Sequence, residues 1–123
     1  MAAFIIGIPK LSDADPDLIG SYFAQIEATL VPYGGRFRAT PDHRIEVLEG
    51  DWRPPEGLAV MEFPSLERAQ AWYHSTEYAP LIALRDAAHL RADAILVDGL
   101  AEDETLFVRN DASPAVQLTT RST

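Results

Sequence analysis

The chain contains no cysteine among its 123 residues. Disulfide bonds, thiolate metal sites and cysteine nucleophiles are therefore excluded. Basic residues are also scarce, because 10 Lys and Arg stand against 19 Asp and Glu and the formal net charge is -9. Phosphate backbones and anionic membrane surfaces bind clustered cations, so this balance argues against nucleic-acid and membrane partners.

Long apolar runs are missing as well, since none approaches the roughly 20 residues needed to cross a bilayer. The apolar N-terminal run, MAAFIIGIP, has no basic segment before it and no small-residue cleavage site after it, so a signal peptide is not expected. With 47% hydrophobic and 24% charged residues, the composition is typical of a soluble globular protein, for which we expect a cytoplasmic location.

Motifs for metals and cofactors are a third absence. His43, His74 and His89 have no partner at the spacing of a recognisable zinc motif. Gly34-Gly35 reads as a helix stop, not as the glycine-rich loop that holds a nucleotide phosphate. No GxSxG sequence marks a serine nucleophile. We therefore expect neither a metal nor a cofactor.

The clearest element that is present is a helix beginning after Asp15, an N-cap residue followed by proline at the first helical position. Pro32 and Gly34-Gly35 end it. Its apolar residues recur at three- and four-residue spacing and so form one face: Leu18, Ile19, Tyr22, Phe23, Ile26 and Leu30.

A second helical region runs from Leu66 to about Leu90, with Ser65 as its N-cap. His74-Ser75 interrupts the apolar pattern, so we expect a break there, with Ser75 capping the second segment.

Four apolar or alternating segments predict strands, at residues 3–8, 36–49, 58–63 and 94–97. The second is long and interrupted by Pro41-Asp42, and a hairpin formed within residues 36–49 is the alternative. The order β-α-β-β-α-β predicts an α+β, ferredoxin-like subunit: a four-stranded antiparallel sheet with two helices on one face.

The first, third and fourth strands are apolar on both sides, so the sheet face without helices needs a cover. A second copy packed sheet to sheet is the expected one, which predicts a homodimer. Residues 1–99 form this domain and residues 100–123 a C-terminal extension. Within the extension, residues 104–108 can add one strand before a tail of flexible composition.

Glu62 and Arg36 are the first candidates for a site. Glu62 interrupts an apolar strand, and a buried carboxylate must be paired, hydrogen-bonded or protonated, which makes it a candidate general base. The alternative is a structural pair with Arg36 or Arg85. Arg36 itself can clamp an anion bidentately, or form an ion pair with Glu62 or Glu49.

Aromatic and titratable residues gather around the predicted helix break. His74 is a candidate for proton transfer, the role that histidine side chains commonly have, and Tyr73 and Tyr78 can position a ligand or hydrogen-bond to neighbours. Trp72 belongs to the core. Trp52 either stacks on a ligand at a pocket rim or closes the end of the barrel.

Four blocks, YGGRF, EVLEGDWRP, EFPS and AWYHSTEY, occur in the order and spacing of domain-of-unknown-function family 1330, which the chain resembles across roughly residues 3 to 99. The resemblance implies a ferredoxin-like subunit that pairs into a dimeric α/β barrel, and it implies no established activity. The chain departs from the family at residues 40–43, where TPDH replaces a Gly-rich turn, and in the tail past Gly99.

Two functional hypotheses remain. In the first, the protein binds a small organic molecule between sheet and helices, with cofactor-free chemistry by analogy to other dimeric α/β barrels, which perform metal-free monooxygenation, lactone isomerisation and decarboxylation. The alternative is a non-enzymatic dimeric interaction or ligand-binding module. Under the first hypothesis the catalytic candidates are Glu62 and His74, and the substrate-binding candidates are Arg36, Tyr73, Tyr78 and Trp52.

Overall fold

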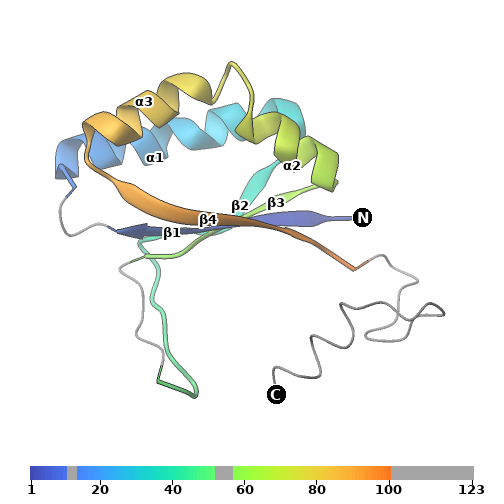
Figure 1. Ribbon diagram of the computed structural model, residues 1–123, viewed down its shortest axis with the longest axis horizontal. Coiled ribbons are helices and arrows are strands. Elements are labelled where there is room, and N and C mark those ends of the chain that lie inside the picture. The colour runs from blue at the N-terminus through green and yellow to red at the C-terminus, as the bar shows by residue number, and fades with distance from the viewer. Residues whose placement is uncertain (11–13, 52–56, 101–123) are drawn as a thin grey trace.

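One antiparallel sheet carries helices on a single face (Figure 1). The computed structural model describes residues 1–10, 14–51 and 57–100. Its elements follow in chain order: β1 (Ala3–Lys10), α1 (Pro16–Leu30), the short 3-10 helix η1 (Val31–Tyr33), β2 (Arg36–Ala39), β3 (Ala59–Phe63), α2 (Leu66–Tyr73), α3 (Ala79–Ala87) and β4 (Arg91–Asp98).

The strand order is β2-β3-β1-β4, and every neighbouring pair is antiparallel. The α+β, ferredoxin-like prediction is therefore confirmed. Three α-helices rather than two cover the sheet within the described residues, because the second helical region is broken into α2 and α3. Of the predicted extension at residues 100–123, residues 101–123 lie outside the described residues, and so does the strand predicted at 104–108.

Caps predicted from single residues are in place. The Asp15 carboxylate accepts a hydrogen bond from the Asp17 backbone N–H at 3.0 Å, and the Ser65 hydroxyl accepts one from the Arg68 N–H at 3.1 Å. Gly34, with φ of 72°, ends the first helical segment in the left-handed conformation.

The role predicted for Ser75 is wrong in part. A break does follow α2, but α3 begins after Tyr78 with no side-chain cap. The Ser75 hydroxyl instead bridges the break, donating to the Trp72 carbonyl oxygen at 2.7 Å and accepting from the Tyr78 N–H at 3.0 Å. Ser75 therefore fixes the turn between the two helices.

The second strand is much shorter than predicted. β2 ends at Ala39, and residues 40–51 form neither the rest of a long strand nor the alternative hairpin. The Thr40 hydroxyl lies 2.7 Å from Nδ1 of His43, and the His43 N–H donates to the Thr40 carbonyl at 3.1 Å, so a closed turn replaces the strand. Residues 40–51 then project away from the sheet on the side opposite the helices (Figure 1).

Strands β1 and β4 are longer than their apolar runs. β1 continues through Pro9 to Lys10, and β4 starts at Arg91, with a pairing register that runs over all eight residues of both strands. The start of β4 was not predicted because it contains the polar residues Arg91 and Asp93. An edge strand tolerates such exposed polar side chains, so they do not interrupt β4.

The core lies between the helices and the sheet. Trp72, Phe63 and Leu30 are its largest fully buried side chains, which confirms the assignment of Trp72. The Trp72 indole N–H donates to the Thr29 hydroxyl at 2.9 Å, so its one polar group is satisfied.

Gly35 allows the chain after the helix stop to pass against the Phe63 ring, since an added Cβ would lie 2.5 Å from Cε2 of Phe63. Gly35→Ala should therefore lower the free energy of unfolding by about 1–3 kcal/mol. Gly20→Ala is the matched control: no heavy atom lies within 4 Å of its added Cβ, so it should gain up to about 1 kcal/mol of helix propensity. Urea denaturation measures both, and a Gly35→Ala variant as stable as the parent would contradict the packing.

Candidate functional site

A small cavity of about 50 Å3 lies between the helices and the sheet. The sheet forms the floor of this cavity. Several sheet residues there have little or no side chain, so the space above them is not filled. An added Cβ at Gly7 would meet only the Cβ of Ala59, at an ordinary 3.9 Å. The residues of this floor with small side chains are Gly7, Ala59, Ala92 and Ala94.

Two buried tyrosines line the cavity from the helical side. The hydroxyls of Tyr22, on α1, and Tyr78, before α3, are 2.7 Å apart. Burial raises the pKa of the Tyr78 phenol far above its usual range, and the neighbouring Tyr22 raises it further. Tyr78 is therefore a neutral hydrogen-bonding group at physiological pH and not a base.

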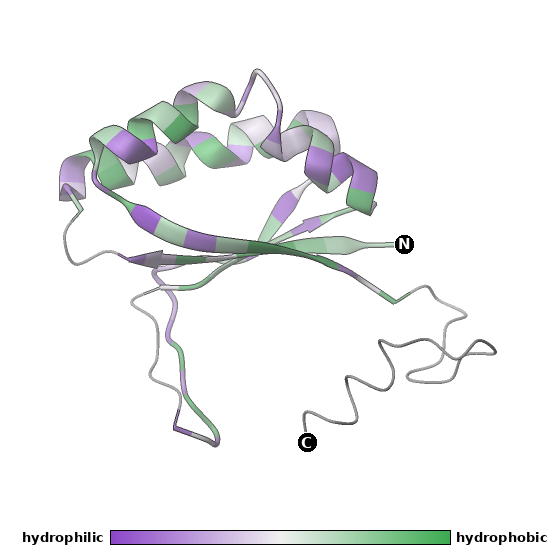
Figure 2. Ribbon diagram, viewed as in Figure 1, coloured by the Kyte–Doolittle hydropathy of each residue, from purple (hydrophilic) through white to green (hydrophobic). Residues whose placement is uncertain are grey.

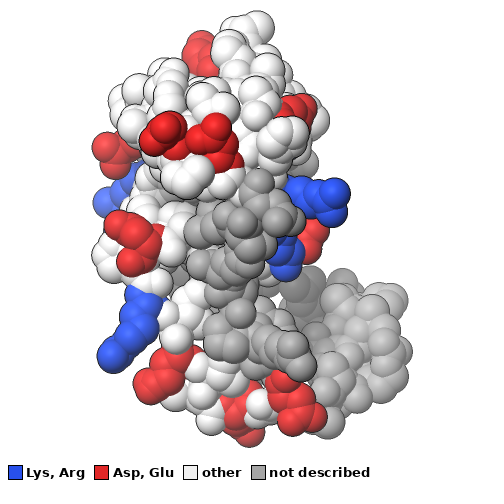
Figure 3. Space-filling model, turned by 90° about the vertical axis from the view of Figure 1, so that its left-hand side faces the viewer, with Lys and Arg blue, Asp and Glu red and all other residues white. Residues whose placement is uncertain are grey.

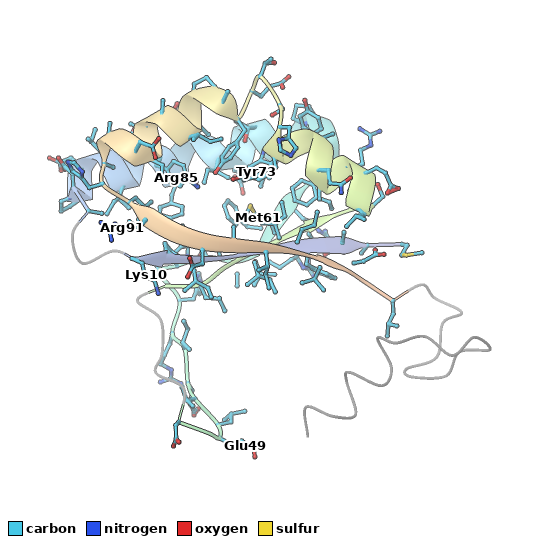
Figure 4. All side chains as sticks on the ribbon, viewed as in Figure 1. Lys10, Glu49, Met61, Tyr73, Arg85 and Arg91 are labelled. Carbon is cyan, nitrogen blue, oxygen red and sulfur yellow. The ribbon has the colours of Figure 1, made fainter. Side chains whose placement is uncertain are left out.

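Arg85 is the charged group of the cavity. It is half-buried on α3, and Figure 4 shows it below the helices, in the layer that also contains Tyr73 and Met61. Burial alone would lower the pKa of its guanidinium, but the phenols of Tyr78, Tyr22 and Tyr73 outweigh burial and hold that pKa above its usual value. The guanidinium thus stays positive beside the hydroxyl pair.

A groove of about 230 Å3 adjoins the cavity at the edge formed by α2 and β4. Gln70, Tyr73 and His74 line its helical side. Tyr73, like Ile5 and Ala94, also lines the cavity, so its ring stands between the two spaces. That ring is 37% exposed and makes an edge contact with His74, at a centroid distance of 5.2 Å.

A larger groove of about 480 Å3 lies on the other side, between α1 and the turn after β2. Its carboxylates are Glu27 and Asp42, and hydrogen bonding from Thr40 lowers the pKa of Asp42. Phe23 and Phe37 line both this groove and the cavity. Although it is larger, we favour the inner cavity as the site, because its tyrosine hydroxyls are buried among apolar side chains, whereas Glu27 and Asp42 are exposed.

Glu62 and Arg36 lie elsewhere. Met61 and Phe63 pack against the helices, so Glu62 between them faces the opposite side of the sheet. Its Oε1 is 3.6 Å from Nη2 of Arg36 and 3.2 Å from Nε of Arg38. The structure therefore contains the pair with Arg36 that was the structural alternative for Glu62.

The sequence-based candidates are thus divided between two surfaces. Tyr73 and Tyr78 line the cavity and His74 the adjoining groove. Arg36 and Glu62 lie on the other face of the sheet. Trp52 lies outside the described residues.

Two cavity residues were missed as site candidates, although the sequence carried a signal for each. Tyr22 lies on the apolar face of α1, where its hydroxyl is a polar group that needs a partner. Arg85 falls at a position of the apolar periodicity in the second helical region, where a charge is unexpected. The contact between α1 and α3 explains both signals, because it brings Tyr22 and Arg85 to the same cavity.

Within the described ranges, no group of three or more His, Asp or Glu residues is arranged to hold a metal ion. In the same part of the chain, no helix has the length and apolar character required for a membrane span.

The fold and the cavity define a ferredoxin-like α+β domain with a small space between its sheet and helices. The chain belongs to the family described as Domain of unknown function (DUF1330), whose family model matches residues 2–100. This confirms the resemblance found in the four sequence blocks.

Solved structures are similar in fold at low sequence identity. A crystal structure of the methylated RPA0582 protein has a TM-score of 0.62 at 11% identity and covers 84% of each chain. The RPA0582 protein of unknown function from Rhodopseudomonas palustris has a TM-score of 0.59 at 14% identity, covering 81% of this chain and 83% of that one. Rv0793 from Mycobacterium tuberculosis has a TM-score of 0.45 at 16% identity, covering 85% of this chain and 100% of that one. No sequence among the curated proteins matches this chain.

Proposed function

We propose that the protein binds a small organic molecule in the cavity between its sheet and its helices. The observation that supports this is the hydroxyl pair of Tyr22 and Tyr78 beside Arg85, in a space whose other walls are mainly apolar. An apolar surface with a few convergent polar groups is the usual composition of a ligand site.

Size is the first requirement that the site must meet. The cavity of about 50 Å3 is too small for a ligand on its own. Rotation of the half-exposed Tyr73 ring would join it to the groove of about 230 Å3. The joined space approaches about 300 Å3, the lower end for small-molecule sites.

Within this proposal, Tyr73 and Tyr78 position the ligand, and His74 at the mouth of the groove is the group suited to proton transfer without a cofactor. Glu62 and Arg36 would serve the opposite face of the sheet instead, because they do not line the cavity.

We also propose that the opposite face is the interface of a homodimer, which would serve a non-enzymatic interaction module equally well. Apolar residues occupy the middle of the sheet (Figure 2), and on this face Ile95 is 58% and Val97 40% exposed. Beyond it, the projecting residues 40–51 carry Leu48 at 88% exposure. A second copy of the sheet is the most direct cover for such a patch.

Gly7→Val tests the ligand site. The new side chain would fill the cavity, and it should raise the free energy of unfolding by about 1 kcal/mol by replacing glycine in a strand. The same change should abolish the melting-temperature shifts that a panel of small metabolites produces with the parent protein.

Gly20→Val is the matched control, because Gly20 lies on the exposed side of α1 and is not part of the cavity. It should retain every ligand shift. Unchanged ligand shifts in a stable Gly7→Val variant would show that the cavity is not the binding site.

A further inference from the structure

Within the described part of the chain, Arg85 forms no ion pair with an acidic side chain. The chain carries 19 Asp and Glu, and acidic side chains are spread over the surface shown in Figure 3. Even so, the ion pairs among the described residues involve only Arg36, Arg38, Glu62 and the pair His43–Asp42. A half-buried guanidinium with phenols beside it, and no ion pair among the described residues, is incompletely neutralised, and this favours binding of an anion from outside the chain.

The hydroxyl pair supplies a hydrogen-bond donor in the same place. Tyr22 and Tyr78 share one hydrogen bond, but together they carry two hydroxyl hydrogens. Their shared hydrogen bond uses one of these hydrogens, so the other is available to a ligand. A carboxylate has two oxygens, one for this hydroxyl and one for the Arg85 guanidinium, so its geometry suits the two donors.

The remaining walls select an apolar body for such a ligand. From the cavity to the groove they consist mainly of apolar side chains, among them Ile5, Leu90 and Leu96. The limited volume restricts the body to about the size of a phenyl ring or a short alkyl chain.

Charge also distinguishes the two routes into the cavity. The route past Phe23 and Phe37 opens into the large groove, where Glu27 and Asp42 would repel an anion. The route past Tyr73 opens into the groove with Gln70 and His74, and the described residues that line this groove include no Asp or Glu. An anionic ligand is therefore steered to the Tyr73 side.

Building on the proposed function, we infer that the cavity binds a small monocarboxylic acid with an apolar body, that Arg85 and the Tyr22–Tyr78 pair hold its carboxylate, and that the acid enters past Tyr73.

Titration of the full chain with phenylacetate and with phenylacetamide, followed by backbone amide NMR shifts, tests this inference. The two probes share size and apolar body, but only phenylacetate carries the charge. The parent protein should bind phenylacetate at least about tenfold more tightly than phenylacetamide, as a charge-assisted contact predicts. Arg85→Gln should remove this preference, by weakening phenylacetate binding and leaving phenylacetamide binding unchanged.

Arg68→Gln is the matched control, because Arg68 is exposed on α2 and is not part of the cavity or its groove. It should keep the preference. If Arg85→Gln does not fold, Arg85→Lys retains the charge without the planar fork, and it should keep the preference for the acid with weaker affinity.

The outcomes separate the two proposals. Equal affinity for acid and amide, with both lost in Gly7→Val, would overturn the carboxylate inference and leave the ligand site standing. An acid preference that survives in a folded Arg85→Gln variant would also overturn the inference. Absence of binding by either probe up to millimolar concentration would count against the inference and the proposed site together.

Discussion

Trp72→Ala is expected to lower the free energy of unfolding by about 3–5 kcal/mol, the cost of deleting a large buried aromatic side chain. Trp72 is 1% exposed, and its ring centroid lies 4.2 Å from that of Tyr78 and 5.7 Å from that of Phe63. It therefore joins α2, the helix break and β3. Since a domain of this size is stable by only about 5–15 kcal/mol, the loss should bring the variant close to unfolding.

Two controls separate packing from hydrogen bonding at this position. Trp72→Phe keeps an aromatic ring but leaves the Thr29 hydroxyl without its indole donor, so the expected loss is smaller, about 1–3 kcal/mol. Val31→Ala removes methyl groups from a side chain that is 69% exposed, and it should stay within about 0.5 kcal/mol of the parent. Urea unfolding followed by circular dichroism measures all three, and a Trp72→Ala midpoint equal to that of the parent would disprove the central role of this residue.

The fold could be predicted from the sequence where local chemistry decides it. Helix ends depend on residues within a single turn of the chain. Each end predicted from such residues is present in the structure, at Asp15-Pro16, Ser65 and Gly34. The apolar runs likewise gave the number of strands in the sheet. These features need no knowledge of distant residues.

Strand lengths could not be obtained in this way. β2 stops at Ala39 because the turn formed by residues 40–43 satisfies its own polar groups. β4 begins at Arg91 because eight residues of β1 are available to pair with it. In both cases a neighbour that is not visible in the local pattern determines where the strand ends.

The division of the candidate site has a similar cause. A strand that is apolar on both sides does not reveal which side faces the helices, and a shift of one residue exchanges the two faces. Glu62 was correctly recognised as an exception in its strand, but its register opposite Phe4 and Arg36 assigns it to the helix-free face. Arg85 fell within an apolar helical pattern, yet only the approach of α1 to α3 brings Tyr22 beside it.

Ile95→Glu is expected to convert a homodimer into a monomer. On the helix-free face, Ile6 of β1 lies between Val60 and Ile95, at the centre of the apolar patch. Ile95 is 58% exposed in the single chain, so a carboxylate there costs the isolated subunit little. In a sheet-to-sheet dimer the same carboxylate would be buried against apolar side chains, at a cost of several kcal/mol.

Light scattering after size exclusion measures the change directly. The parent protein should have twice the chain mass of 13.6 kDa, and Ile95→Glu the mass of one chain. Val31→Glu places the same charge at an exposed position on the helical side, and it should remain dimeric. A parent protein that is monomeric at micromolar concentration would rule out the proposed interface.

The proposed interface and the cavity lie on opposite sides of one sheet, so Gly7→Val tests the cavity without altering the proposed interface. Gly7 faces the helices, and Gly7→Val should lose ligand binding but keep the mass of the dimer. If the parent is monomeric and binds ligand, and Gly7→Val abolishes that binding, the dimer proposal is wrong and the ligand-site proposal stands. A dimeric parent with no ligand would favour the interaction module, because the helix-free face alone would then account for the chain's behaviour in solution.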